Sequence, residues 1–399
     1  MKRFFLFYLQ ITPFILSFLI IVRALKWVNI LTYALPVFLI VNISMAFKLK
    51  ILSKENYYHL FILLLFPFYA LLTSIWSVHS IYTFIRAVYL TLLILGLYSS
   101  IALTKNLIKN YDVKFLSSAN LLMIIVSLIS LAFNFPDDIW SGGNKSGFLG
   151  FSVHQNTFAS ALFFTMPAVI LLFANKNQKL KWTFYVVIFI NVLLIILSHS
   201  RAVVFALTAT LIIYSVLTKS INLFLIVAFI IGLVFTLYFP VMPFNKMINN
   251  YFLKGGQNIL DRRIFLWEAS FQAAKKGNLL GLGYGISCPD IKTPEYAGSH
   301  YKYGIYVREK GNGILALIEE TGFVGLLLFS LPFFVLFGKA LRKYNSSMFQ
   351  RKENLIYLSF IAGFIIHAQF EAWWVGVGSV QLPFYYITII IEYFKIYVC

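Results

Sequence analysis

The chain is poor in charged residues and in cysteine. Charged residues make up 12% of its 399 residues, roughly half of the share in a typical soluble domain, so an ordinary soluble fold is excluded. The two cysteines, Cys288 and Cys399, are expected on opposite sides of a membrane, which argues against a disulfide framework. The sequence also lacks a His-Glu-x-x-His motif, an Asp-x-Asp motif and a P-loop. We therefore expect no metal site and no cofactor.

Long apolar runs dominate the sequence instead. Hydrophobic residues make up 60% and aromatic residues 18% of the chain, with a mean hydropathy of +0.82. Apolar stretches of roughly 17–25 residues, the length of a helix that crosses a bilayer, recur along the chain. We predict an all-α integral membrane protein with about twelve transmembrane helices. They are expected at residues 4–22, 28–47, 57–75, 81–103, 117–134, 153–174, 182–198, 201–217, 221–240, 312–338, 354–370 and 376–394.

The distribution of basic residues predicts the topology. A net charge of +19 could attract any polyanion. With the N-terminus in the cytoplasm, however, 18 of the 33 Lys and Arg residues fall in segments expected to be cytoplasmic. Successive loops alternate between Lys-rich and Lys-poor, as the positive-inside rule requires. We expect both termini to be cytoplasmic, and no nucleic-acid partner.

One connection is much longer than the others. Residues 241–311 join the ninth and tenth helices and are expected outside the cytoplasm, where they hold most of the polar residues of the outer face. They divide the chain into residues 1–240 with nine transmembrane helices, the large loop, and residues 312–399 with three more.

The large loop is expected to contain an amphipathic helix on the membrane surface. Asp261 is its predicted N-cap and Gly277 its stop. Arg262 and Arg263 lie in the first turn, where the helix dipole disfavours cations. A bound anion such as a phosphate would offset that cost, while contact with solvent or lipid headgroups is the alternative.

Two further arginines are expected near the outer ends of helices, Arg86 and Arg201. A charged side chain inside a bilayer costs about 2.5–3.5 kcal/mol on insertion scales, so it needs a partner or a function. A guanidinium group suits a diphosphate because it donates bidentate hydrogen bonds. We predict that both arginines bind substrate; the alternative is that each anchors its helix at lipid phosphates.

Acidic residues cluster at the beginning of the tenth helix. Glu309 precedes this helix, and Glu319 and Glu320 lie about two turns inside it. Adjacent residues point about 100° apart on a helix, so at least one of the two carboxylates must face protein or a wet cavity. All three are candidates for a catalytic base, and a structural ion pair with an arginine is the alternative.

A third polar group lies at the end of the eleventh helix. His367 and Glu371 are four residues apart and so share one helix face. Trp373 and Trp374 follow them, and paired tryptophans suit a membrane interface or a sugar-binding surface. We predict that His367, Glu371 and Trp373 contribute to substrate binding, with a structural histidine as the alternative.

These motifs together resemble the O-antigen ligase and polymerase superfamily (Wzy/WaaL type) of bacterial membrane glycan assembly proteins. The resemblance extends from about residue 150 to residue 372. The segments that carry it are Gly150 to Asn156, Ser200-Arg201, Arg263 to Trp267, Leu280 to Gly285, and Asn312, Leu315, Glu320, Gly322 and Gly325.

The resemblance implies a GT-C-like fold and a metal-independent, inverting glycosyltransfer at the outer face of the bacterial cytoplasmic membrane. The donor would be an oligosaccharide on undecaprenyl pyrophosphate. Arg201 and Arg263 would hold the pyrophosphate, with Arg86 as a looser match and Asn156 and Asn312 as further substrate-binding positions. A chain-length regulator and a flippase are the implied membrane partners.

The chain departs from the ligase branch at one position. That branch usually has His-Asn where this sequence has Gly311-Asn312, and its His is the leading candidate for acceptor activation. We therefore predict a polymerase that joins lipid-linked repeat units. Glu320 is the first candidate for the base and Glu309 the second, and Glu319, His300 and Glu371 are the others. A ligase that moves finished glycan to a lipid or protein acceptor, and a transporter or flippase of the lipid-linked oligosaccharide, are the alternatives.

Overall fold

A computed structural model describes most of the chain. The described residues are 2–22, 34–51, 54–105, 111–133, 147–150, 152, 154–174, 181–218, 259–293, 300–302, 305–342 and 348–398.

The described residues of the N-terminal half form eight α-helices and a 3-10 turn. Each apolar run predicted up to residue 217 corresponds to one of these helices. They are α1 (Lys2–Val22), α2 (Ala34–Lys48), α3 (Lys54–Leu72) with the turn η2 (Thr73–Ile75), α4 (Ser80–Lys105), α5 (Tyr111–Phe133), α6 (Gln155–Ala174), α7 (Lys181–Leu197) and α8 (Arg201–Thr218). The ninth predicted helix, residues 221–240, lies outside the described residues.

In the C-terminal part, the described residues form an amphipathic helix, a hairpin, three apolar helices and a 3-10 turn. These elements are α11 (Ile259–Gly277), strands β1 (His300–Lys302) and β2 (Ile305–Val307), α12 (Gly313–Arg342), α13 (Met348–Ala368), the 3-10 turn η7 (Trp373–Val375) and α14 (Gln381–Val398). The strands pair antiparallel, with Tyr301 opposite Tyr306. No strand was predicted, and the predicted N-cap Asp261 is wrong because α11 begins two residues earlier.

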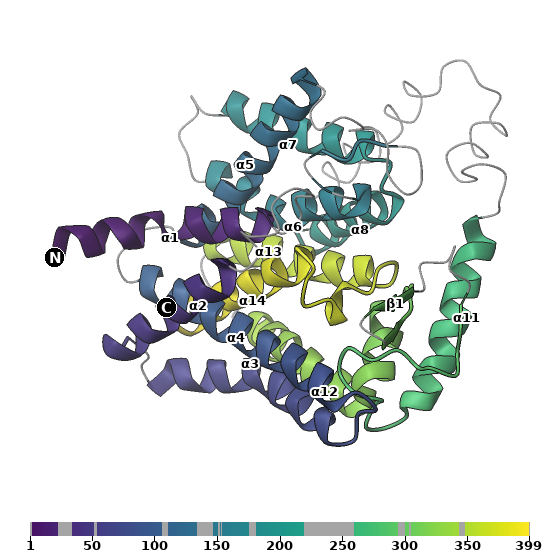
Figure 1. Ribbon diagram of the computed structural model, residues 1–399. Helices are drawn as coiled ribbons and strands as arrows, with labels where there is room; N and C mark the ends of the chain where they lie inside the picture. The colour runs from purple at the N-terminus through teal and green to yellow at the C-terminus, as the bar shows by residue number, and fades with distance from the viewer. Residues whose placement is uncertain are drawn as a thin grey trace, which may run out of the picture.

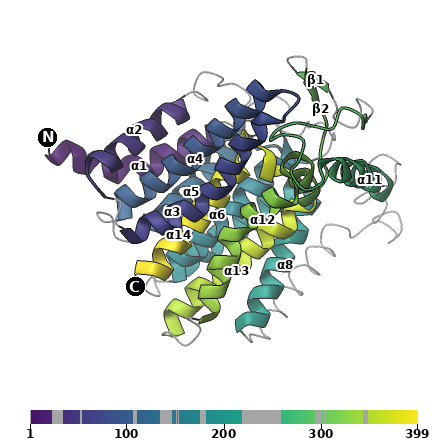
Figure 2. The same cartoon turned by 90° about the horizontal axis from the view of Figure 1, so that it is seen from below.

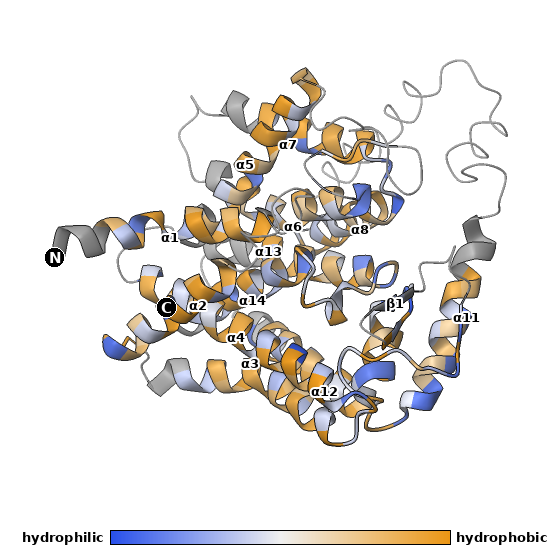
Figure 3. Cartoon of the chain, in the orientation of Figure 1, coloured by the Kyte–Doolittle hydropathy of each residue, from blue (hydrophilic) through white to orange (hydrophobic). Residues whose placement is uncertain are grey.

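The helices have the length and composition of membrane spans. Five described helices are long and apolar enough to cross a bilayer: Tyr57–Ile75, Ser80–Lys105, Phe115–Phe133, Arg201–Thr218 and Gly313–Lys339. Five shorter apolar helices accompany them. Figure 3 shows apolar residues throughout these helices and polar ones around the beginning of α8, the hairpin and α11. The prediction of a predominantly α-helical, multi-pass membrane protein is thus confirmed.

The helices lie side by side in a bundle, and α11 and the hairpin project together from one end of it (Figures 1 and 2). Helix α13 packs on α8, α11 packs on α12, and α14 contacts α4 and α6. Inside the bundle, Phe164 stacks on Phe364, with ring centroids 3.9 Å apart. Asn120 of α5 donates to Thr165 of α6 and exchanges hydrogen bonds with Asn191 of α7, at 2.9–3.0 Å. Such buried amide pairs hold helices together where lipid offers no hydrogen-bond partner.

Candidate functional site

The segment that follows α11 docks into a break in α12. Gly322, inside α12, has a φ of 67°, which interrupts the helical hydrogen bonds. The carbonyl groups of Glu319 and Glu320 instead accept the backbone N–H groups of Leu282 and Gly283, each at 2.9 Å. The break therefore converts two helical carbonyl groups into a docking surface for the loop.

Glycine is required along this docked segment. Gly281, Gly283 and Gly285 all have positive φ, between 81° and 118°. A Cβ on Gly281 would overlap the backbone of Glu320, and one on Gly285 would overlap the guanidinium of Arg86. This close approach to α12 and α4 explains the spaced glycines of the motif from Leu280 to Gly285.

The two adjacent glutamates of α12 lie in a buried ionic cluster. Arg308 Nη2 lies 2.8 Å from Glu319 Oε2, and neither side chain is exposed. Lys310 Nζ lies 2.5 Å from Glu320 Oε1 and 3.6 Å from Glu319 Oε2. The other oxygens accept backbone N–H groups, Glu319 from Cys288 at 2.7 Å and Glu320 from Gly285 at 2.6 Å.

The ionic cluster argues against the predicted role of Glu319 and Glu320 as a catalytic base. Every carboxylate oxygen of Glu319 and Glu320 already accepts a hydrogen bond or an ion pair, so a substrate hydroxyl would have to displace one of these donors. The geometry favours the structural ion pair that the sequence left open. The sequence analysis missed Arg308 and Lys310 as partners of the two glutamates, although two basic residues ten and eleven positions before two acids were a signal for this pairing.

Glu309 lies between the two ion-paired residues and is exposed. Arg308 and Lys310 are only 3% and 9% exposed and reach the same carboxylate pair. Because alternate residues of an extended segment point to opposite sides, Glu309 is turned away from the cluster. It remains a candidate for contact with substrate.

Arg86 ties α4 to the loop that follows α13. Its Nη2 donates to the carbonyl oxygen of Val375 at 2.7 Å, and its Nη1 donates to the hydroxyl of Tyr82 at 2.9 Å. Its guanidinium also lies 5.7 Å from the ring centroid of Tyr284, whose phenolic pKa is raised by burial. Two of its N–H groups are thus used within the protein, which favours a positioning role alongside the predicted substrate contact.

An aromatic contact joins the regions of the other two predicted arginines. Phe370 packs against Phe205 of α8 and Trp267 of α11, with ring centroids 5.5 and 6.2 Å apart. Arg201 precedes Phe205 by four residues, and Arg263 precedes Trp267 by four residues, so each lies on the same helix face as its aromatic partner. Arg201 is half-buried at the beginning of α8, whereas the side chain of Arg263 lies outside the described part.

Asn312 caps α12 and binds the end of α13. Its Oδ1 accepts the backbone N–H of Leu315 at 3.0 Å, the pattern of an N-cap. Its Nδ2 donates to Gln369, at 3.1 Å to Oε1 and 3.3 Å to the backbone oxygen. The Asn-x-x-Leu motif therefore has a structural explanation, and Asn312 belongs to the framework of the site.

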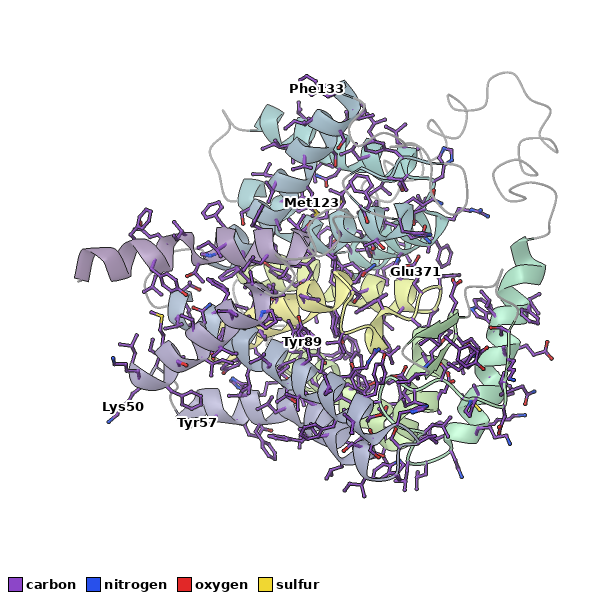
Figure 4. The ribbon with its side chains drawn as sticks, in the orientation of Figure 1. Lys50, Tyr57, Tyr89, Met123, Phe133 and Glu371 are labelled. Carbon is purple, nitrogen blue, oxygen red and sulfur yellow. The ribbon has the colours of Figure 1, made fainter. Side chains whose placement is uncertain are left out.

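His367, Glu371 and Trp373 lie close together, but the predicted shared helix face is wrong because α13 ends at Ala368, before Glu371. The indole N–H of Trp373 donates to His367 Nδ1 at 3.0 Å, and His367 Nε2 lies 4.0 Å from Glu371 Oε2. Glu371 is found at the end of α13 in Figure 4, toward α8 and α11. The expected position of the tryptophans at a surface is wrong: Trp373 and Trp374 are each 4% exposed and pack in the aromatic core.

Asn156 lies apart from these groups in the described contacts. It is in the first turn of α6, where its backbone N–H donates to His154 Nδ1 at 3.2 Å, and its side chain is half-buried. Within the described ranges, no group of three or more His, Cys, Asp or Glu residues could hold a metal ion.

Fold and site define a multi-pass α-helical membrane protein that gathers arginines, ion pairs and a histidine–glutamate pair around the ends of α4, α8, α12 and α13. The family model described as O-antigen ligase matches residues 184–330, from α7 into α12. This match supports the resemblance to the O-antigen ligase and polymerase superfamily that the motifs indicated. No curated protein matches the chain. The match to the family model supports a function of the O-antigen ligase or polymerase type.

Proposed function

We propose that this chain is a polysaccharide polymerase of the bacterial cytoplasmic membrane. It transfers the growing glycan from undecaprenyl pyrophosphate to a sugar hydroxyl of another lipid-linked repeat unit at the outer face. The observation that carries the proposal is the contact of Phe370 with both Phe205 and Trp267. This contact brings the helix turns that begin with Arg201 and Arg263 toward one another, beside Glu371.

The arginines supply the electrostatic part of the reaction. As the bond between the sugar and pyrophosphate breaks, negative charge grows on the leaving diphosphate, and guanidinium groups stabilise it by bidentate hydrogen bonds. The transfer is inverting because the acceptor hydroxyl attacks the anomeric carbon opposite the leaving group. The resemblance to the superfamily implies that no metal ion takes part.

The acceptor distinguishes a polymerase from a ligase. We favour the polymerase because the residue before Asn312 is Gly311, where the ligase branch usually carries its acceptor-activating His. A ligase that transfers finished glycan to a lipid or protein is the second candidate. A transporter of the same lipid-linked oligosaccharide would move it across the membrane without breaking the glycosidic bond.

The decisive experiment deletes the gene and complements it with the wild-type chain, with Arg201→Ala, or with Lys276→Ala. Lys276 pairs with Asp290 at an exposed position on α11, so its variant is a matched loss of one cation. We expect single-repeat products in the deletion strain and with Arg201→Ala, and normal polymer with Lys276→Ala, on gels of surface and lipid-linked glycans.

Each other outcome points to a different function. Long polymer that stays on its carrier in the deletion strain would indicate a ligase. Unchanged glycan with Arg201→Ala, at a normal amount of protein in the membrane, would overturn the phosphate role of Arg201. Transport of lipid-linked oligosaccharide into liposomes without bond cleavage would indicate the transporter.

A further inference from the structure

We propose that Glu371 takes the proton from the acceptor hydroxyl, and that His367 and Trp373 position its carboxylate. This inference rests on the proposed glycosyl transfer and names the group that activates its acceptor. It assigns the acceptor side of the site to the end of α13, beyond the segment that matches the family model.

The hydrogen bond from Trp373 determines the tautomer of the neutral His367 side chain. An indole N–H can only donate, so His367 Nδ1 must accept, and the neutral imidazole then carries its proton on Nε2. That N–H is on the side of Glu371, whose Oε2 lies 4.0 Å away. A separation of this length in a substrate-free site can shorten to a hydrogen bond when the acceptor binds.

The side chain of Glu371 is partly exposed, and that of His367 behind it is buried. The side chain of Glu371 is 19% exposed, whereas that of His367 is fully buried. His367 lies among aromatic rings, with the centroid of Phe164 5.9 Å from its own. The glutamate can therefore meet a substrate while the histidine and tryptophan behind it are held by the packed core. A buried group that orients an accessible base is the usual arrangement around a reacting side chain.

The loop that carries Glu371 is fixed on both sides. Before it, Gln369 is bound by the N-cap residue Asn312. After it, Val375 is bound by Arg86 from α4. Phe370, directly beside Glu371, contacts the aromatic residues of α8 and α11. These four contacts hold the carboxylate near the turns of the two arginines assigned to the pyrophosphate.

The other described acids in this region are differently placed. Glu319 and Glu320 are enclosed in the ionic cluster, and Asp290 faces Lys276 at an exposed position. Glu309 is exposed but has no buried group shown to orient its carboxylate, so it is the rival base. Glu268 is exposed on α11, and its replacement by Gln serves as the control for the loss of one carboxylate.

The proposed reaction is a direct displacement at the anomeric carbon of the donor glycan. The acceptor oxygen forms a bond to the anomeric carbon of the donor glycan, and its proton passes to Glu371. The bond between that carbon and the pyrophosphate oxygen breaks, and the polyprenyl pyrophosphate leaves with the bonding electron pair. The protonated carboxyl then releases its proton to water, which restores the carboxylate.

The test uses the full chain in nanodiscs and lipid-linked repeat units extracted from the deletion strain. Glu371→Gln should lower kcat by about 10²–10⁴-fold, the contribution of a general base, and leave the KM for the donor within about threefold. Glu371→Asp should recover part of the rate because it keeps the carboxylate. Glu268→Gln should match the wild type in both constants.

Variants of the two inner residues separate positioning from folding. Trp373→Phe keeps an aromatic ring but removes the donor to His367 Nδ1, so we expect a lower kcat with an unchanged KM. Nitrogen chemical shifts of His367 should show the Nε2–H form in the wild type and a mixture of tautomers in Trp373→Phe. Wild-type kcat in Glu371→Gln would overturn the inference, as would a loss confined to Glu309→Gln. Absence of polymer with the wild-type chain would instead contradict the proposed function.

Discussion

Arg308 and Glu319 form an ion pair that is closed to solvent, with 2.8 Å between Nη2 and Oε2. The pair connects the segment after β2 to the second turn of α12, and the same carboxylate also accepts a hydrogen bond from the backbone N–H of Cys288. Three parts of the chain are therefore joined at one side chain, and the geometry of the site depends on that joint.

Removing one partner of this pair should be costly. Arg308→Met leaves the carboxylate of Glu319 buried without its closest cation, and breaking a buried ion pair costs about 3–5 kcal/mol. The double variant Arg308→Met/Glu319→Gln removes both charges and should recover more than half of that loss. A double-mutant cycle on thermal unfolding in detergent measures the coupling. Strictly additive losses would show that the pair contributes nothing as a unit.

The glycines of the docked segment should not tolerate a side chain. Gly281→Ala introduces a Cβ that overlaps the backbone of Glu320 in a conformation with a φ of 81°, and backbone strain of this kind costs on the order of 1–3 kcal/mol before any overlap is counted. Gly338→Ala is the matched control, because nothing lies within 4 Å of its Cβ position. We expect glycan synthesis to be lost in the first variant and kept in the second. Equal activity of both would contradict the docking of this segment on α12.

Arg86 should be sensitive to replacement by lysine even though its charge is kept. One guanidinium spans the Tyr82 hydroxyl and the Val375 carbonyl oxygen, which a lysine ammonium cannot reproduce. A displaced Val375 moves the loop of Glu371, so we expect turnover to fall by roughly 10- to 100-fold. Tyr82→Phe removes one of the two hydrogen bonds and should cause a smaller loss. Turnover is measured in nanodiscs. A larger loss of turnover in Tyr82→Phe than in Arg86→Lys would contradict the positioning role of Arg86.

Asn312 allows its two roles to be separated. Asn312→Ala removes the cap and the contact with Gln369, at a cost of about 1 kcal/mol for the cap. Asn312→Asp keeps an oxygen for the N–H of Leu315 but places a carboxylate against Gln369 Oε1. The aspartate variant should therefore unfold near the wild-type temperature yet turn over more slowly. A large drop in its unfolding temperature would show that the contact with Gln369 is needed for folding itself.

The class of protein and most of its helices follow directly from the order of residues. The runs of apolar residues correspond to α1 to α8 and α12 to α14, with boundaries that differ by up to six residues. A segment of this length and composition is stable in a bilayer only as a membrane helix. The segments around Gly281 and Glu320 both belong to the motifs that resemble the superfamily. Nothing local, however, indicated that Gly322 breaks α12 and that the two segments meet there.

The roles of individual charged residues depend on contacts between distant parts of the chain. Glu319 and Glu320 look like catalytic acids in an apolar helix, but Arg308 and Lys310 reach them from a different segment and enclose them. Trp373 looks like an interfacial residue, but it is buried against His367. A hydrophobic run determines its own structure through the cost of unsatisfied backbone groups in lipid. An ionisable side chain takes its role from the partners that folding brings within hydrogen-bond distance, and those partners are separated from it in sequence.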